Sequence, residues 1–319
     1  MREITFQMEI HDPANLEKVR VPALMVGVFE GPRFPKEIGT LVDQYAPVKL
    51  DQLMESGEMQ GKFKEFVMLH LPPEAPFQRI LFMGMGKEED FTFDILESIV
   101  AKATRTLRRG NCSEMAIMTQ MFDRLSAEDL GRAVALGATL GLYRIRRYRK
   151  ESSEEAFRGY FKKIVFLVSP ETDREALARG CRIGNVLAQA TNRARDIANE
   201  PACYMTPRLL AKRAEEVAKE CDLFLEVFAE EDMKELGMGG ILAVSAGSEE
   251  PARLIVLRYE KHPGAPRIGL VGKGVTFDSG GISLKPSIGM HQMKYDMAGA
   301  AAVIETVQAA AELDLPVNI

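Results

Sequence analysis

Long apolar runs and signal-peptide features are both missing from this sequence of 319 residues. No stretch approaches the roughly 18 apolar residues that a membrane-spanning helix needs, so we expect no membrane-embedded part. The first residues carry charges throughout and lack an apolar core segment, so we also expect no secretory signal peptide.

Cysteine is scarce, and its spacing excludes two kinds of site. The four cysteines show no C-x-x-C pair, so neither a zinc knuckle nor a dithiol redox motif is indicated. Unpaired thiols are typical of proteins in a reducing compartment, which predicts a cytoplasmic location. The cysteines are Cys112, Cys181, Cys203 and Cys221.

A basic tail is absent as well, and the formal net charge is −5. Nucleic acid is therefore not an implied partner. Hydrophobic residues make up 46% and charged residues 27% of the chain, which is the balance of an ordinary globular protein. The length suits two domains better than one.

The first half of the chain alternates short apolar runs with helix-like segments. This alternation predicts an α/β domain with a largely parallel or mixed sheet. The expected strands are Ala23–Phe29, Phe66–Leu71, Arg79–Met85, Ala116–Thr119 and Lys163–Val168, and the expected helices cover residues 93–109 and 127–142.

A long connecting helix is predicted after this domain. Ser169, Pro170 and Glu171 have the residue types of an N-cap, a first helical position and a first-turn acid. Pro201 follows Asn199 and Glu200 and should stop the helix. The predicted organisation is therefore an N-terminal domain over residues 1–168, a connecting helix over 169–198 and a second domain over 199–319.

The second domain resumes the alternation of strands and helices. Thr206 and Pro207 begin a helix, and Gly237 ends a shorter one. Ile319 lies in a segment with the composition of a beginning strand, so we expect this domain to be incomplete. The expected strands are 223–228, 254–257, 268–271 and one from Pro316, and the expected helices are 231–236 and 297–313.

Candidate chemistry is concentrated in residues 271–303, where lysines and aspartates occur among many glycines. Three interpretations compete: ordinary loop charges, a phosphate site and a carboxylate metal site. The phosphate loop motif fails, because Arg267 and Gly274 stand where it requires a glycine and a hydroxyl residue. Aspartate oxygens suit hard divalent cations and also bind zinc. The residues alone leave the first and third interpretations open.

Two motifs in this segment resemble the metal-binding signature of the cytosolic leucine aminopeptidase family. They are V-G-K-G-V-T-F-D-S-G-G-I-S-L-K-P from Val271 and M-K-Y-D-M-A-G-A-A-A-V from Met293, and A-R-D-I-A-N-E-P-A at Ala194–Ala202 supports them. The resemblance implies an α/β fold with an N-terminal macro-like domain and an incomplete C-terminal metallopeptidase domain.

The resemblance also implies the roles of four residues. Lys273, Asp278 and Asp296 match ligands of two divalent metal ions, Mn²⁺ or Zn²⁺, with Asp278 bridging the two. Lys285 matches a catalytic lysine that polarises the scissile carbonyl. The implied activity is release of N-terminal amino acids, with a leucine-type preference, from peptides with a free N-terminus. The implied assembly is a homohexamer.

One family motif, N-T-D-A-E-G-R, is not found in the sequence. In the family it supplies further ligands and an arginine, and the number of ligands governs metal affinity. We therefore expect the 319-residue chain by itself to bind at most one ion well and to hydrolyse peptides poorly. The alternative is a truncated, non-catalytic relative that acts as a scaffold or regulatory subunit.

Two weaker candidates remain. His291 lies inside the signature segment, but the family does not use this position, and a loop histidine is the simpler interpretation. Gly84–Lys87 follows an expected strand and could cradle a phosphate, which would make the first domain a nucleotide-binding module. A lone G-x-G is a weak signal, and turn glycines are the favoured interpretation.

Overall fold

The computed structural model describes the whole chain except residues 1–3, 11–15, 17, 32–33, 146 and 149–159. The chain divides into two compact units, Met1–Ala188 and Gln189–Ile319. The division falls within helix α6 (Arg174–Asn199), where the sequence predicts a connecting helix. Helix α6 therefore contributes residues to both units.

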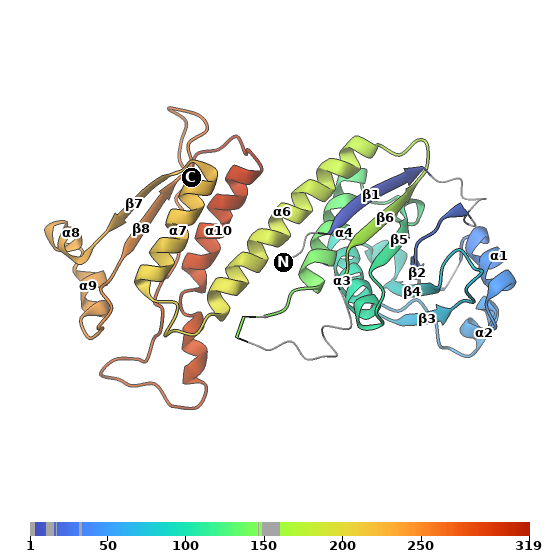
Figure 1. The fold of residues 1–319 in the computed structure, drawn as a ribbon, viewed down its shortest axis with the longest axis horizontal. Coiled ribbons are helices and arrows are strands. Elements are labelled where there is room, and N and C mark those ends of the chain that lie inside the picture. The colour runs from blue at the N-terminus through green and yellow to red at the C-terminus, as the bar shows by residue number, and fades with distance from the viewer. Residues whose placement is uncertain (1–3, 11–15, 17, 32–33, 146, 149–159) are drawn as a thin grey trace. The chain divides into compact units, whose positions relative to one another are not determined.

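The N-terminal unit is built on a six-stranded sheet with the order β1-β6-β5-β2-β4-β3 (Figure 1). Strand β3 pairs antiparallel with β4, and the other neighbouring pairs are parallel. The sequence prediction of an α/β fold with a largely parallel or mixed sheet is confirmed. The strands are β1 (Thr5–Ile10), β2 (Ala23–Phe29), β3 (Phe66–His70), β4 (Arg79–Gly86), β5 (Glu114–Met118) and β6 (Lys163–Val168).

Helices cover both faces of this sheet (Figure 1). Leu24 and Met25 are adjacent on β2 but belong to different buried clusters, because successive strand residues point to opposite faces. Leu24 packs with the α1 and α2 side, and Met25 packs with the α3 and α4 side. The helices are α1 (Lys36–Tyr45), α2 (Leu50–Glu55), α3 (Phe93–Arg109) and α4 (Ala127–Gly141), with short 3-10 turns η2 (Glu88–Asp90) and η3 (Thr119–Phe122).

The start of α6 differs from the sequence prediction, which placed the N-cap at Ser169. The helix begins at Arg174, and the Asp173 carboxylate caps it by accepting the Ala176 N–H at 2.9 Å. Ser169 instead forms a turn, in which its Oγ lies 3.2 Å from the hydroxyl of Thr172. The hydroxyl of Ser169 is therefore engaged before the helix begins, and the aspartate takes the cap.

The C-terminal unit contains a two-stranded antiparallel sheet, β7-β8, together with helices. A buried cluster joins the C-terminal part of α6 to α7 and α10 and includes Ile197, Val217 and Ile304. Pro207 begins α7 as predicted, and Gly237 follows α8 with a φ of 69°. The elements are α7 (Pro207–Cys221), β7 (Phe224–Phe228), α8 (Glu230–Glu235), α9 (Gly239–Ser245), β8 (Leu254–Arg258), η4 (Met290–Tyr295) and α10 (Ala298–Glu312).

The predicted strand over residues 268–271 is wrong. The Ile268 N–H donates to the Asn318 carbonyl at 2.9 Å, but no ladder continues along the described part of the chain. Val271 is 98% exposed. An apolar run forms a strand only where a neighbouring strand supplies backbone partners. The expected strand near Pro316 is likewise limited to isolated bridges at Asn318.

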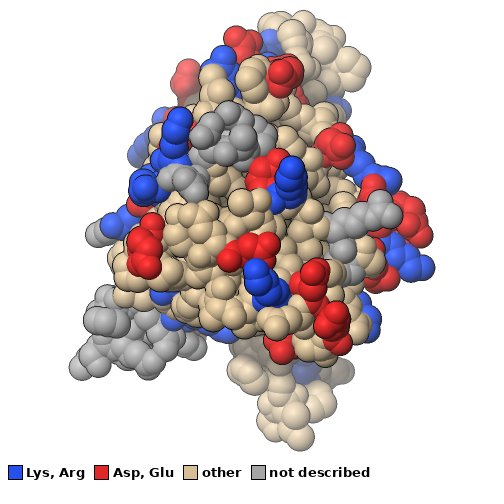
Figure 2. Space-filling view, turned by 90° about the vertical axis from the view of Figure 1, so that its right-hand side faces the viewer, with Lys and Arg blue, Asp and Glu red and all other residues tan. Residues whose placement is uncertain are grey.

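Charged side chains of both signs are interspersed on the face drawn in Figure 2. No helix in the described ranges has the length and apolar character needed to cross a membrane.

The exposed apolar side chains of the C-terminal unit generate a prediction about association. Ile282 is fully exposed and Ile288 is 94% exposed, so both add apolar surface to the segment of the chain that contains Val271. We expect Ile282→Ser with Ile288→Ser to lower self-association of the 319-residue chain, because exposed apolar patches drive contact between molecules. The melting midpoint should change little, since neither side chain is in the core.

Size-exclusion chromatography with light scattering measures this association. The control is Ile10→Ser, which removes an exposed apolar side chain from the N-terminal unit and should leave association unchanged. Equal association of the double variant and the parent chain would show that these two isoleucines do not drive it.

Candidate functional site

The glycine-rich segment after Val271 is held against the first turn of α10. A Cβ on Gly272 would lie 2.4 Å from the Gly299 carbonyl oxygen, so only glycine permits this approach. The Ala300 N–H, at the start of α10, donates to the Lys273 carbonyl at 2.9 Å. The backbone of Lys273 is therefore fixed by one of the N–H groups that a helix leaves free at its beginning.

Lys273 and Asp296 form an ion pair. The Lys273 Nζ lies 2.7 Å from the Asp296 Oδ2, and Asp296 comes directly after η4 and two residues before α10. The Lys273 side chain is 57% exposed, whereas that of Asp296 is 20% exposed. The Asp296 carboxylate raises the pKa of Lys273, chiefly through this short polar contact.

A second pair forms a few residues away. The Lys285 Nζ donates to the Asp278 Oδ2 at 2.5 Å and lies 3.1 Å from the Met293 sulfur. The other Asp278 oxygen accepts the Gly280 N–H at 2.9 Å. The hydrogen bond from Lys285, and then the one from Gly280, hold the pKa of Asp278 below its usual range. Asp278 is therefore an ionised carboxylate fixed at both oxygens.

The turn between these residues has a backbone that requires glycine. Gly280 has a φ of 92°, and a Cβ there would lie 2.3 Å from the Ser283 carbonyl oxygen. The Lys285 N–H donates to the Ser279 carbonyl at 2.9 Å, which closes the turn. This closure brings the Lys285 ammonium back to Asp278.

The two pairs are close enough to affect each other electrostatically. The charge of Lys273 contributes to the lowered pKa of Asp278, and Asp278 in turn contributes to the raised pKa of Lys273. The structure therefore gathers the four residues singled out by the sequence, Lys273, Asp278, Lys285 and Asp296, into one region.

The donor set can be tested for its fit to a divalent cation. The Asp296 Oδ2 is shielded from solvent and lacks a hydrogen bond of regular geometry. Its negative charge is therefore balanced by the positive charge of Lys273. A shielded carboxylate oxygen of this kind suits a divalent cation. Among the described residues, no group of three or more His, Cys, Asp or Glu side chains is placed to hold a metal. A metal here would therefore rest on two aspartates and the lysine amine, and that set fits.

Gly84–Lys87 is explained by backbone packing rather than by a phosphate. A Cβ on Gly84 would lie 1.9 Å from the Lys62 carbonyl oxygen. The N–H groups of Gly84 and Gly86 donate to carbonyls of the 61–65 loop at 2.8 Å each, so neither is free for a ligand. A nearby cavity of about 430 Å³ is lined mainly by Phe and Met, and its acidic Glu37 would repel phosphate. Backbone packing, as the turn interpretation expects, therefore accounts for Gly84 and Gly86.

His291 lies on η4 and is exposed. The sequence analysis missed a group of charged residues on three helices of the C-terminal unit, centred on Glu305. No motif marks these residues, because they are far apart in the chain.

Comparison with known proteins identifies two family domains. Residues 25–152 match the N-terminal domain, and residues 192–319 match the catalytic domain, of the cytosol aminopeptidase family. A probable cytosol aminopeptidase of Alkaliphilus metalliredigens is 37% identical over 308 residues, covering 96% of this chain and 61% of the relative. A probable cytosol aminopeptidase of Geobacter sp. (strain M21) is 37% identical, covering 98% of this chain and 62% of the relative.

Solved structures give the same result. The bottromycin maturation enzyme BotP in complex with Mn has a TM-score of 0.73 and 32% identity, covering 93% of this chain and 58% of that one. A mutant of tomato leucine aminopeptidase has a TM-score of 0.79 and 26% identity, covering 99% of this chain and 61% of that one.

This chain spans about three fifths of the length of the curated relatives cited here. None of the proteins cited is described as a scaffold, so the non-catalytic alternative gains no support from them. Two domain matches in the expected order, together with the relatives, decide the assignment: the chain belongs to the cytosol aminopeptidase family.

Proposed function

We propose that this chain supplies the first part of the active centre of a metal-dependent aminopeptidase, which releases N-terminal amino acids from peptides. The observation that carries the proposal is the adjoining arrangement of two lysine–aspartate pairs, Lys273 with Asp296 and Lys285 with Asp278. The chain covers only part of its relatives, so the proposal concerns the protein extended to their full length.

Lys273, Asp278 and Asp296 are the residues that would hold metal in this proposal. Two divalent ions, Mn²⁺ or Zn²⁺, would supply Lewis acidity and a deprotonated water when bound. Lys273 must lose its proton to act as a ligand, because an ammonium has no lone pair. A metal cation beside Lys273 would disfavour the charged ammonium form of this lysine. That effect is opposite to the effect of the Asp296 carboxylate, which favours the ammonium. The bottromycin maturation enzyme BotP was solved in complex with Mn, which supports Mn²⁺ as one of these two metals.

Lys285 would act directly on the substrate. Its ammonium is anchored by Asp278 at 2.5 Å, which limits its movement. A fixed positive charge of this kind stabilises the oxygen that becomes negative when a peptide carbonyl is attacked. The side chain is 35% exposed, so a peptide could reach it.

The remaining features of the proposal follow from the family. The substrates would be peptides with a free N-terminus, with a leucine-type preference, as the name of the tomato relative suggests. The location would be cytoplasmic, in keeping with the names of the curated relatives. The assembly would be a homohexamer.

The first test concerns Asp278. In the protein of full family length, Asp278→Asn should reduce hydrolysis of a leucyl substrate by more than tenfold, since loss of outer contacts alone costs roughly 10–100-fold. Initial rates with added Mn²⁺ measure this loss. Asp43→Asn is the matched control, because Asp43 is a surface aspartate that pairs with Lys49 in the N-terminal unit. Retention of more than about a tenth of the activity would contradict the role of Asp278.

The second test concerns Lys285. Lys285→Ala should lower kcat by on the order of 10²–10³ while the metal content stays the same. Steady-state kinetics together with metal analysis separate the two effects. Lys261→Ala is the control, because Lys261 also pairs with an aspartate, Asp314, but lies outside the site. Loss of metal with an unchanged kcat per bound ion would make Lys285 structural.

A further inference from the structure

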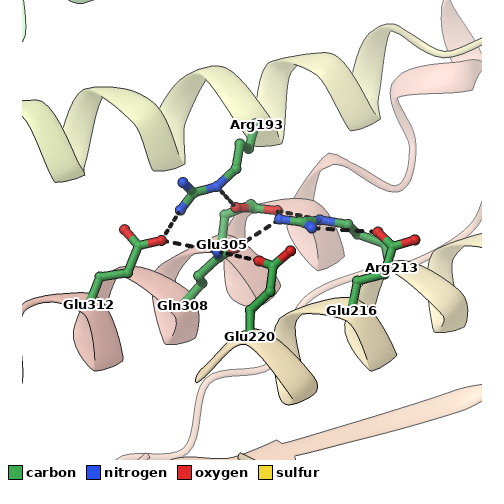
Figure 3. Close-up of polar contacts among 7 residues, drawn as sticks. All are labelled: Arg193, Arg213, Glu216, Glu220, Glu305, Gln308 and Glu312. Atoms are coloured by element: carbon green, nitrogen blue, oxygen red, sulfur yellow. Dashed lines mark hydrogen bonds and ion pairs between the residues drawn. The ribbon is translucent and has the colours of Figure 1, made fainter. Parts of the chain in front are cut away.

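Three helices of the C-terminal unit are joined by a polar network that no motif of the sequence marks (Figure 3). Its centre is Glu305 on α10, whose side chain is 2% exposed. The figure shows one arginine reaching Glu305 from α6 and another from α7. The network consists of Arg193 from α6, Arg213, Glu216 and Glu220 from α7, and Glu305, Gln308 and Glu312 from α10.

Each carboxylate oxygen of Glu305 is bound by a different arginine. The Arg193 Nε donates to Oε2 at 2.5 Å. The Arg213 Nη2 and Nε donate to Oε1 at 2.8 Å and 3.0 Å. The sequence separations are 112 and 92 residues, so these contacts fix α10 against two distant segments of the chain.

The groups around Glu305 are also paired. The Arg213 Nη2 donates to the Gln308 Oε1 at 2.7 Å, and the Arg193 Nη2 lies 3.1 Å from Glu312. The Gln308 amide donates to Glu220 at 3.1 Å and to Glu312 at 3.0 Å. A buried charge is tolerated only with such partners. The need to keep these partners in place leaves few alternative ways for the three helices to pack.

Helix α10 connects this network to the candidate metal centre. Ala300, in its first turn, holds the Lys273 carbonyl, and Asp296 lies just before the helix. Glu305 comes five residues after Ala300, which is about 7.5 Å along a helix axis. A rotation or translation of α10 would therefore displace the backbone that positions both Lys273 and Asp296.

We propose that Glu305 is a positioning residue for the metal centre. Arg193 and Arg213 bind Glu305 and so fix the rotation and the axial position of α10. The first turn of α10 in turn fixes the positions of Lys273 and Asp296. The functional part of this inference rests on the proposed function, whereas the mechanical part, from Glu305 to Ala300, does not. The two parts can be tested separately.

The mechanical part is tested by amide hydrogen exchange in the 319-residue chain. Glu305→Gln keeps the size of the side chain but removes its charge. We expect exchange of the Ala300 amide to become faster by about tenfold or more, because local opening of the first turn of α10 becomes easier. The amides of α3 report the stability of the N-terminal unit and should not change, and the amides of β7 report unfolding of the C-terminal unit as a whole. Glu220→Gln is the matched control, because Glu220 contacts Gln308 rather than an arginine.

A second variant guards against simple misfolding. Arg213→Met with Glu305→Met removes opposite charges together, and Arg193 keeps Glu312 as a partner. This variant should fold, yet it should show the same faster exchange at Ala300. Wild-type exchange at Ala300 in this folded double variant would overturn the proposal.

The functional part is tested with Mn²⁺ alone by isothermal titration calorimetry in the protein of full family length, to which the proposed function applies. Glu305→Gln and the double variant should bind Mn²⁺ about tenfold more weakly than the parent protein. Asp296→Asn should lose binding. Unchanged affinity in both Glu305 variants, with binding lost in Asp296→Asn, would overturn the positioning role. If Ala300 responds but the parent protein of full family length binds no Mn²⁺, the mechanical link stands and the proposed metal centre falls.

Discussion

The close contact between Gly272 and Gly299 is the constraint on which the candidate site depends. Neither residue has a side chain, so the loop backbone can approach the first turn of α10 and let the Ala300 N–H reach the Lys273 carbonyl. Any larger residue at Gly272 would collide with backbone, which cannot move aside as a flexible side chain can. The position of the Lys273 side chain, and hence its pairing with Asp296, follows from this contact.

Ion pairs between acidic and basic side chains are the second organising feature of the C-terminal unit. Both acidic residues lie on α10 or just before it. Before its first turn, Asp296 is neutralised by Lys273. Farther along the helix, Glu305 is neutralised by Arg193 and Arg213. The same physical rule applies at both carboxylates, because a carboxylate shielded from water needs a cation or hydrogen-bond donors. The lysine that pairs with Asp296 is exposed to a ligand, whereas Glu305 is buried in the middle of α10.

Most of the elements could be predicted because their signals are local. Buried strands such as β2 and β6 appear as continuous apolar runs, and Pro207 and Gly237 mark helix ends through their own backbone preferences. The wrong strand prediction involves a partner that local sequence does not specify. The apolar residues 268–271 have the composition of a strand but lack a neighbouring strand to pair with. Strand β1 was not predicted, because it is an edge strand with partly exposed side chains.

The sequence by itself determined the family motif, the α/β class and the identity of the four candidate residues, because spacing and residue type are written along the chain. Tertiary structure alone decided that Lys273 pairs with Asp296 and Lys285 with Asp278. It also decided that Glu305 lies between arginines 112 and 92 residues away. Such pairings depend on how helices pack and how closely backbones approach, and ion pairs across long sequence separations leave no periodic trace in the sequence.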